Sequence, residues 1–339
     1  MTRPRSTALA LLTTALMLSA LVGCGDDSDD AGGSTTEPLG AAEPAQAPVP
    51  EATPAGTVRD LAPQPEGMVY DSETDVLAVA VRNATQLVLI QGETGEEIRR
   101  IPIPGHARHL QLAGPGGPVL VPAEDSNTFV SVTLPDGETS QTEVGEYPHD
   151  ASQARSGRVL VADERGGTLS VVEDGDVVHT FDDRQQPGGV AAVGDEVGVV
   201  DVGDFTLSLY DVDTEESLGS VPAGAGPTHL VATNDDRLVV ADTRGDEILV
   251  FGIDPLEQVA SLPLEGTPYG ITYDPEADVV WVTLTALNEL VGLDMSGDTP
   301  TEIARIPTVQ QANTVAVDPV SGRLWTTSRE TGELQTIDP

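Results

Sequence analysis

The amino-acid sequence predicts an all-β fold, a seven-bladed β-propeller, and three observations support this prediction. One type of short apolar segment, rich in Val, Leu and Ala, recurs seven times at a spacing of roughly 40 residues. Each copy is followed by a polar turn, a second apolar segment and a corner that usually contains proline. Helical periodicity of useful length occurs only in residues 8–22.

The recurring segment is the strand that anchors each predicted blade. Its seven copies cover residues 76–81, 118–123, 158–163, 196–201, 237–242, 279–284 and 323–328. Each copy is short, apolar and rich in β-branched residues, which is typical of a buried strand. Together with its neighbours it makes a unit of four short antiparallel strands. Such a meander buries both faces only by packing against further copies around an axis, as in a propeller.

The last unit lacks its outer strand. After Trp325 the chain has one more strand, residues 333–337, before the final Pro339. Residues 57–61 precede Pro65 in the same way that residues 98–101 precede the next corner. We therefore expect the N-terminal strand to complete blade seven and close the ring, so that the propeller domain covers residues 57–339.

The N-terminus has the pattern of a signal peptide. Arg3 and Arg5 precede the apolar run 8–22, which is too short to cross a bilayer comfortably. The following Leu-Val-Gly-Cys, ending at Cys24, resembles the bacterial lipobox, in which the cysteine is diacylated and becomes the first mature residue. The resemblance implies a signal peptide over residues 1–23, lipidation at Cys24, and a protein anchored to the cell membrane on its extracytoplasmic side.

The segment after Cys24 has the composition of a tether. Residues 24–56 begin with a run of aspartates and continue with Ala, Pro, Gly, Glu and Thr. Such a segment has too little apolar surface to offset the entropy lost on ordering. We expect a flexible, acidic spacer that holds the propeller away from the membrane.

Composition excludes several chemistries. The formal net charge is −40, so phosphate backbones are repelled and nucleic acid is not an expected partner. The sequence has no lysine, which removes Schiff-base chemistry, and Cys24 is its only cysteine. Once that residue carries lipid, the protein has no disulfide, zinc–thiolate site or cysteine nucleophile.

The repeats resemble those of the YVTN β-propeller family, which includes YncE-like periplasmic proteins. Residues 159–163 with 168–172, the corner 148–151, and residues 221–224 with 227–230 carry the resemblance. It covers residues 57–339 with a degenerate repeat. The resemblance implies the propeller fold and a role in binding ligands or partners, without one chemistry shared by the family.

The top face of the predicted propeller, where the inner strand of each blade begins, carries the candidate site. Ligand-capable side chains gather there on blades two to five, at the corners and at the ends of the recurring strands: His109, Asp150, His229, Asp163, Asp201 and Asp242. Histidine and carboxylate ligands suit Zn²⁺. Because blades two and five are not adjacent, His109 and His229 would have to reach across the channel.

Two other interpretations of this face stay open. The three aspartates that end strands can instead accept hydrogen bonds from the backbone of nearby turns. The face can also hold a small-molecule or peptide pocket with Arg108, His149 and Tyr269 as polar anchors.

These observations favour a non-enzymatic binding or scaffold lipoprotein at the cell envelope. Its expected partner is a protein, a cell-wall component or a small molecule that docks on the top face. The alternative is a periplasmic zinc carrier, or a metal-dependent hydrolase of the lactonase type with His149 or His229 as general base. The sequence has no G-x-S-x-G nucleophile elbow, and its glycine-rich stretches precede no helix.

Overall fold

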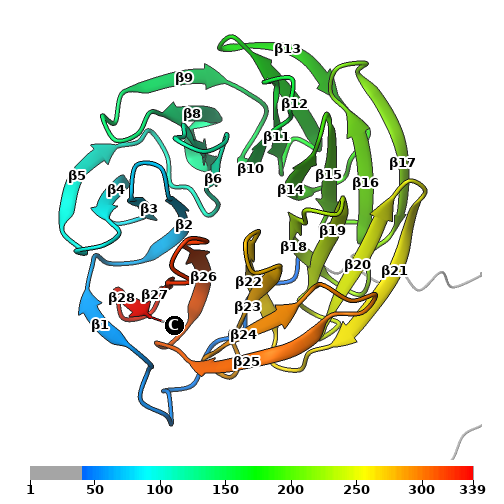
Figure 1. Ribbon diagram of the computed structural model, residues 1–339. Coiled ribbons are helices and arrows are strands. Elements are labelled where there is room, and N and C mark those ends of the chain that lie inside the picture. Colours follow the sequence, from blue (N-terminus) through cyan, green and yellow to red (C-terminus); the bar gives the residue numbers. More distant parts are fainter. Residues whose placement is uncertain (1–39, 339) are drawn as a thin grey trace, which may run out of the picture. The chain divides into compact units, whose positions relative to one another are not determined.

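Seven four-stranded antiparallel sheets are arranged as blades around a central axis (Figure 1). The computed structural model describes residues 40–338. The expected signal peptide (1–23), Cys24 and the first part of the expected tether (24–39) lie outside the described residues. The predicted fold class, a seven-bladed propeller of four-stranded blades, is confirmed.

The strands follow one another from the channel outward in every blade. Blade 1 contains β2 (Pro65–Asp71), β3 (Val76–Val81), β4 (Gln86–Gln91) and β5 (Glu97–Pro102). Blade 2 contains β6 (Gln111–Leu112), β7 (Val119–Ala123), β8 (Thr128–Val132) and β9 (Thr139–Glu143), with a 3₁₀ turn, η1 (Glu124–Ser126), after β7. Blade 3 contains β10 (Pro148–Gln153), β11 (Val159–Asp163), β12 (Thr168–Glu173) and β13 (Asp176–Phe181). Blade 4 contains β14 (Pro187–Val193), β15 (Glu196–Asp201), β16 (Thr206–Asp211) and β17 (Glu216–Pro222).

The remaining blades repeat this order. Blade 5 contains β18 (Pro227–Ala232), β19 (Arg237–Asp242), β20 (Glu247–Ile253) and β21 (Leu256–Pro263). Blade 6 contains β22 (Pro268–Asp274), β23 (Val279–Leu284), β24 (Glu289–Asp294) and β25 (Thr301–Pro307). Blade 7 contains β26 (Ala312–Val317), β27 (Leu324–Ser328) and β28 (Glu333–Ile337), and its outer strand is β1 (Thr57–Asp60). The recurring apolar segments agree with β3, β7, β11, β15, β19, β23 and β27 to within one residue at either end.

The N-terminal strand closes the ring, as the repeat pattern predicts. β1 pairs antiparallel with β28, and Thr57 and Asp60 stand opposite Thr336 and Glu333. All four residues of β1 are exposed, whereas most of β28 is half-buried or buried. The first and last strands of the propeller therefore belong to one sheet, and the ring has no open edge between blades 7 and 1.

The hydrophobic core lies between neighbouring blades. A cluster that includes Leu87 and Leu89 of blade 1 packs against Val119 and Val130 of blade 2, and all four are fully buried. Similar clusters fill the other six junctions between blades. Each middle strand presents one row of Val, Leu or Ala to each side, so every blade needs both neighbours to bury its apolar surface.

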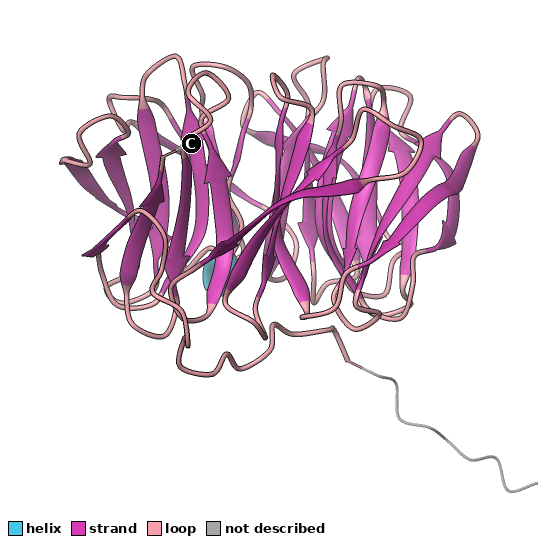
Figure 2. Cartoon of the chain, turned by 60° about the horizontal axis from the view of Figure 1, so that its bottom comes forward, coloured by secondary structure: helices cyan, strands magenta, loops and turns pink. Residues whose placement is uncertain are grey.

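Residues 40–56 lie along the top face, which points downward in Figure 2. Thr285 Oγ1 accepts a hydrogen bond from Ala45 N at 3.0 Å. Gln311 accepts one from Ala47 N at 2.7 Å and donates one to Ala45 O at 2.7 Å. The composition assigned these residues to the tether, but this part of it is bound to the propeller by backbone hydrogen bonds, which leave no mark on composition. No helix within residues 40–338 is long and apolar enough to cross a bilayer.

Candidate functional site

The corners before the inner strands bring polar side chains to the top of the channel. In five blades the inner strand begins at a proline, whereas β6 contains only Gln111 and Leu112. The corner before β6 still follows the repeat, because Glu124 N donates to His106 O as Arg244 N donates to Gly226 O in blade 5. This corner lies close to β2, since a Cβ on Gly67 would be 3.0 Å from the carbonyl carbon of His109. His109 therefore occupies the same position in its repeat as His229.

Three histidines from three blades meet there. His109, His149 and His229 each offer a ring nitrogen, and these nitrogens lie within 4.8 Å of one another. The Nε2 atoms of His109 and His229 are 3.0 Å apart. The ring centroid of His109 is 4.5 Å from that of His149 and 4.4 Å from that of His229. The side chains of His109 and His229, from the non-adjacent blades 2 and 5, therefore do meet across the channel.

Two glutamates hold the ring of His149. Its Nδ1 is 3.1 Å from Glu124 Oε1 and 3.3 Å from Glu164 Oε2. Because a carboxylate can only accept, Nδ1 carries a proton and donates it to the glutamates. A carboxylate behind an imidazole in this way fixes the tautomer and the ring orientation that a metal ligand needs.

The imidazoles of His109 and His229 are neutral at physiological pH. Burial, together with the neighbouring His149 and the charge of Arg108, lowers the pKa of His229 to about 3. Burial and the proximity of His229 lower the pKa of His109 well below its usual value. A neutral imidazole is the form that coordinates a metal. The electrostatics of the cluster therefore favour the ligand state over the charged state.

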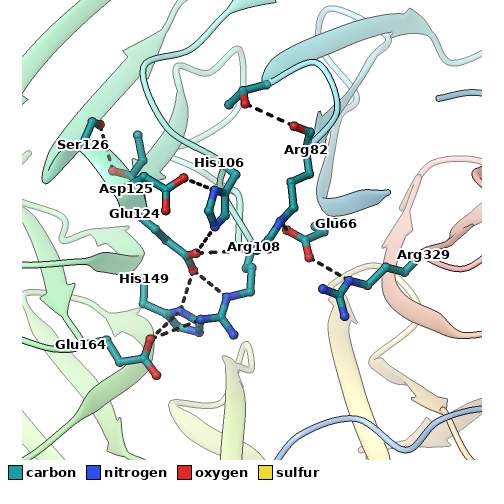
Figure 3. A network of polar contacts seen from close by, with 12 residues as sticks. Glu66, Arg82, His106, Arg108, Glu124, Asp125, Ser126, His149, Glu164 and Arg329 are labelled. Atoms are coloured by element: carbon teal, nitrogen blue, oxygen red, sulfur yellow. Dashed lines mark hydrogen bonds and ion pairs between the residues drawn. The ribbon is translucent and has the colours of Figure 1, made fainter. Parts of the chain in front are cut away.

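A layer of ion pairs lies at the top face of the channel (Figure 3). It is a chain of alternating charge that crosses four blades. Glu66 pairs with Arg329 and with Arg82, each at 3.0 Å, and Arg82 is 4.0 Å from Glu124. Arg108 pairs with Glu124 at 2.7 Å and with Glu164 at 3.4 Å. We call these six residues the charged layer. Its three arginines balance its three glutamates.

Glu124 is the centre of the charged layer. It has no exposed surface, and it also lies 3.0 Å from His106 Nε2. Burial by itself raises the pKa of this carboxyl, but the hydrogen bond with His149 and the charge of Arg108 outweigh it and lower the pKa to about 2. Glu124 is therefore a permanent carboxylate whose oxygens are directed at Arg108, His106 and His149.

Asp163, Asp201 and Asp242 do not join the histidines. Asp242 accepts hydrogen bonds from the backbone of Ala225, Gly226 and Gly245 at 2.7–3.0 Å. Asp201 accepts in the same way from Gln185 and Gly203, at 2.7 and 2.9 Å, among others. Asp163 accepts from the hydroxyls of Thr168 and Ser170. The proposal that these three bind metal is corrected here, since their oxygens fix turns, as in the alternative interpretation.

Asp150 and Tyr269 belong to the channel wall. Asp150 accepts hydrogen bonds from Val190 N at 3.0 Å, Ala151 N at 2.9 Å and the side chain of Gln111. Burial raises the pKa of Asp150 to about 6. It ties blades 2, 3 and 4 together and is not among the grouped metal-binding atoms. Tyr269 stacks edge-on against His229 with ring centroids 4.4 Å apart, and burial raises the pKa of its phenol.

The sequence analysis did not predict the charged layer, because it considered positions one residue too early in each repeat. It considered the residue that ends each recurring strand, but Arg82, Glu124, Glu164 and Arg329 each follow that position. Side chains alternate between faces along a strand, so the last residue of the strand turns away and the next one reaches the channel. Comparing the residue after the strand end across the repeats would have found all four.

Arg108, His149 and Tyr269, the expected anchors of a small-molecule pocket, lie around the same cluster. His149 pairs with the carboxylates that hold Arg108, and Tyr269 packs on His229. Two of the predicted metal ligands, His109 and His229, and the three predicted pocket anchors therefore lie together at the top end of the channel.

Comparison with known proteins shows the fold and no closer kinship. No protein-family profile matches the chain, and no curated protein matches it in sequence. A chain of Kuenenia stuttgartiensis hydrazine synthase superposes with a TM-score of 0.72 at 14% identity, covering 85% of this chain and 98% of that one. Virginiamycin B lyase from Staphylococcus aureus gives 0.70 at 15% identity, covering 84% and 99%. A chain from a crystal structure of the mitotic checkpoint complex gives 0.71 at 13% identity, covering 88% and 96%.

These structures belong to proteins with unrelated roles, so structural similarity to them does not indicate an activity for this chain. What the chain shares with them over most of its length is the seven-bladed β-propeller.

Proposed function

We propose that this propeller is a non-enzymatic binding protein whose ligand is a divalent transition-metal ion, zinc above all. One observation carries the proposal: three imidazole nitrogens, from His109, His149 and His229, lie within 4.8 Å of one another at the top end of the channel. Imidazole nitrogen suits Zn²⁺, Cu²⁺ and Ni²⁺, and three histidines with one open position are a known zinc arrangement.

The geometry fits a zinc ion after a small movement. With Zn–N bonds of about 2.0–2.1 Å and tetrahedral angles, two ligand nitrogens stand about 3.4 Å apart. The pair from His109 and His229 is 3.0 Å apart, and all three ligand nitrogens lie within 4.8 Å of one another. An ion between the rings would separate the first pair slightly.

The surrounding carboxylates support binding over catalysis. Glu124 and Glu164 are paired with Arg108, and the oxygens of Asp150 are held by backbone amides and Gln111. A general base must have an accessible proton acceptor near the reacting group. Every acidic side chain named at this end of the channel is engaged in such contacts, so the site is suited to holding an ion.

The N-terminal pattern supports an address at the cell envelope. In this proposal Cys24 carries lipid, and the propeller is anchored to the extracytoplasmic side of the membrane as a YVTN-like lipoprotein. A metal carrier in that position would hold its ion outside the cytoplasm. Detection of lipid on Cys24 by mass spectrometry of the protein from membranes tests the address, and a soluble, unmodified protein would contradict it.

Calorimetric titration with Zn²⁺ tests the metal proposal. The full chain, stripped of metal with a chelator, is expected to take up one ion at roughly micromolar concentration or below. His109→Ala and His229→Ala are each expected to weaken binding roughly 100-fold or more. His179→Ala is the matched control, because His179 lies on the outer strand β13 and pairs with Glu215 instead.

The result that overturns the proposal is uptake that does not depend on these rings. If the parent chain binds no Zn²⁺, or if both channel variants bind as the parent does, the three histidines are a packing cluster. Circular dichroism of each variant separates loss of the site from loss of the fold.

A further inference from the structure

A cavity leads from the histidines to the opposite face of the ring. Its volume is about 490 Å³. At the top it is lined by His109, His229 and Tyr269, and at the bottom by residues just beyond the inner strands, such as Ser72, Pro275 and Pro319. Glu66 and Arg108 of the charged layer also line its top, and the cavity extends to the bottom face. Its size is within the range of pockets that hold small organic molecules.

The charges at the top end balance only while no metal is present. The charged layer contains three arginines and three glutamates and is neutral as a whole. A divalent ion bound to the three imidazole rings would bring two positive charges that no residue of the layer compensates, and uncompensated charge away from water is costly.

The three histidines leave the coordination of the proposed metal ion incomplete. The three histidines are the full group of metal-capable side chains that the described chain brings together here. Zinc is usually four-coordinate, so one position remains for a ligand from outside the protein. The ligand can reach this position through the cavity, because His109 and His229 line it.

We infer that the metal-loaded site binds a small organic carboxylate. The carboxylate would occupy the open position of the metal and neutralise part of its charge, and its organic body would lie in the cavity. Part of the wall is apolar, with Val69, Val231, Ile271 and Val315 among its residues, which favours a body with apolar surface. This inference rests on the proposed metal-binding function.

Cobalt spectroscopy on the full chain tests the inference with benzoate as the probe. Co²⁺ replaces Zn²⁺ and reports its ligands by its visible absorption. Benzoate is expected to shift the spectrum of the Co²⁺-loaded chain in a saturable way, whereas benzamide, equal in shape but uncharged, is expected to leave it unchanged.

A variant in the cavity wall tests carboxylate binding without altering the histidines that are proposed to hold the metal. Thr272 lines the cavity and takes part in no side-chain hydrogen bond within the described chain. Thr272→Phe is expected to retain Co²⁺ while weakening benzoate binding about tenfold or more, since the ring fills the space. Thr301→Phe, on the exposed outer strand β25, is the matched control and is expected to bind benzoate as the parent does.

The outcomes separate the two proposals. A chain that binds Co²⁺ but gives the same spectrum with and without benzoate overturns the carboxylate inference and leaves metal binding intact. Equal responses to benzoate and benzamide, or an unchanged response in Thr272→Phe, also overturn it. A chain that takes up no Co²⁺ overturns both.

Discussion

His109 and His229, which are 120 residues apart in the sequence, face each other across the channel with their Nε2 atoms at 3.0 Å. Their blades are not neighbours, so both side chains reach across the channel, from the same position of their repeats. One ring must donate and the other accept, which requires that at least one of them be neutral. The pair is therefore a sensitive point in the molecule, since charging both rings breaks it.

Glu124→Gln is expected to weaken Zn²⁺ binding about 10- to 100-fold, although Glu124 is not itself a ligand. The amide removes the negative charge behind His149, and the ring can then adopt the other tautomer. Calorimetry measures the affinity, and ¹⁵N shifts of the His149 ring report its tautomer. Glu138→Gln, on the surface, is the control. An unchanged affinity with a changed tautomer would show that the positioning role is absent.

Asp242→Ala is expected to lower the free energy of unfolding by about 3 kcal/mol without changing metal binding, because several backbone amides lose their acceptor. Those amides belong to Ala225, Gly226 and Gly245. Urea denaturation measures the stability, and zinc stoichiometry measures the site. Asp298→Ala, at an exposed position, is expected to change neither. Loss of zinc from a stably folded Asp242→Ala would restore this aspartate as a ligand.

Removal of residues 57–60 is expected to destabilise the whole propeller by about 3 kcal/mol or more. These four residues form β1, the outer strand of blade 7, and their loss exposes the edge of β28. Thermal unfolding followed by circular dichroism measures the effect. Removal of residues 27–30, of equal length and in the acidic run, is the control. Equal melting temperatures for the two deletions would mean that the closing strand contributes little.

Asp163 is expected to make stability depend on pH. Burial raises its pKa in the folded protein to about 6, from an ordinary value of 3.8. The folded state therefore holds this proton more tightly, and the associated stability is present below about pH 4 and is lost as the pH rises through about 6. A shift of about two pKa units corresponds to about 3 kcal/mol.

Asp163→Asn, which cannot ionise, isolates that contribution. The stability of the parent relative to Asp163→Asn is expected to fall between pH 4 and pH 7 by about 3 kcal/mol, measured by urea denaturation. Asp298→Asn, at an exposed site, is expected to follow the parent at each pH. A constant difference between parent and Asp163→Asn would show that this carboxyl does not titrate in the range.

The blades were predictable because each middle strand is a short β-branched run between polar turns, repeated seven times. Closure by residues 57–60 followed from counting strands, since blade 7 was one short. The meeting of His109 with His149 and His229 could be suspected from their corner positions. It could not be derived, because the sequence does not show how far these side chains reach across the channel.

Two features were missed in the sequence. Glu124 and Glu164 follow the strand ends by one residue, a position that only a comparison across the repeats picks out. Residues 40–56 attach to the propeller through main-chain bonds to Thr285 and Gln311, which composition does not reveal. Sequence reasoning succeeds where burial imposes periodicity, and it fails where a polar contact is set by the path of single residues.

The assignment of one histidine to each of blades 2, 3 and 5 links the site to the completeness of the ring. On an unfinished chain these residues are isolated imidazoles, separated by 40 residues or more of sequence. They reach one another only when the blades stand at their final places around the axis, and β1 arrives at blade 7 to hold them there. The three-histidine cluster therefore forms only when the propeller is completely folded, so its presence reports a correctly closed ring.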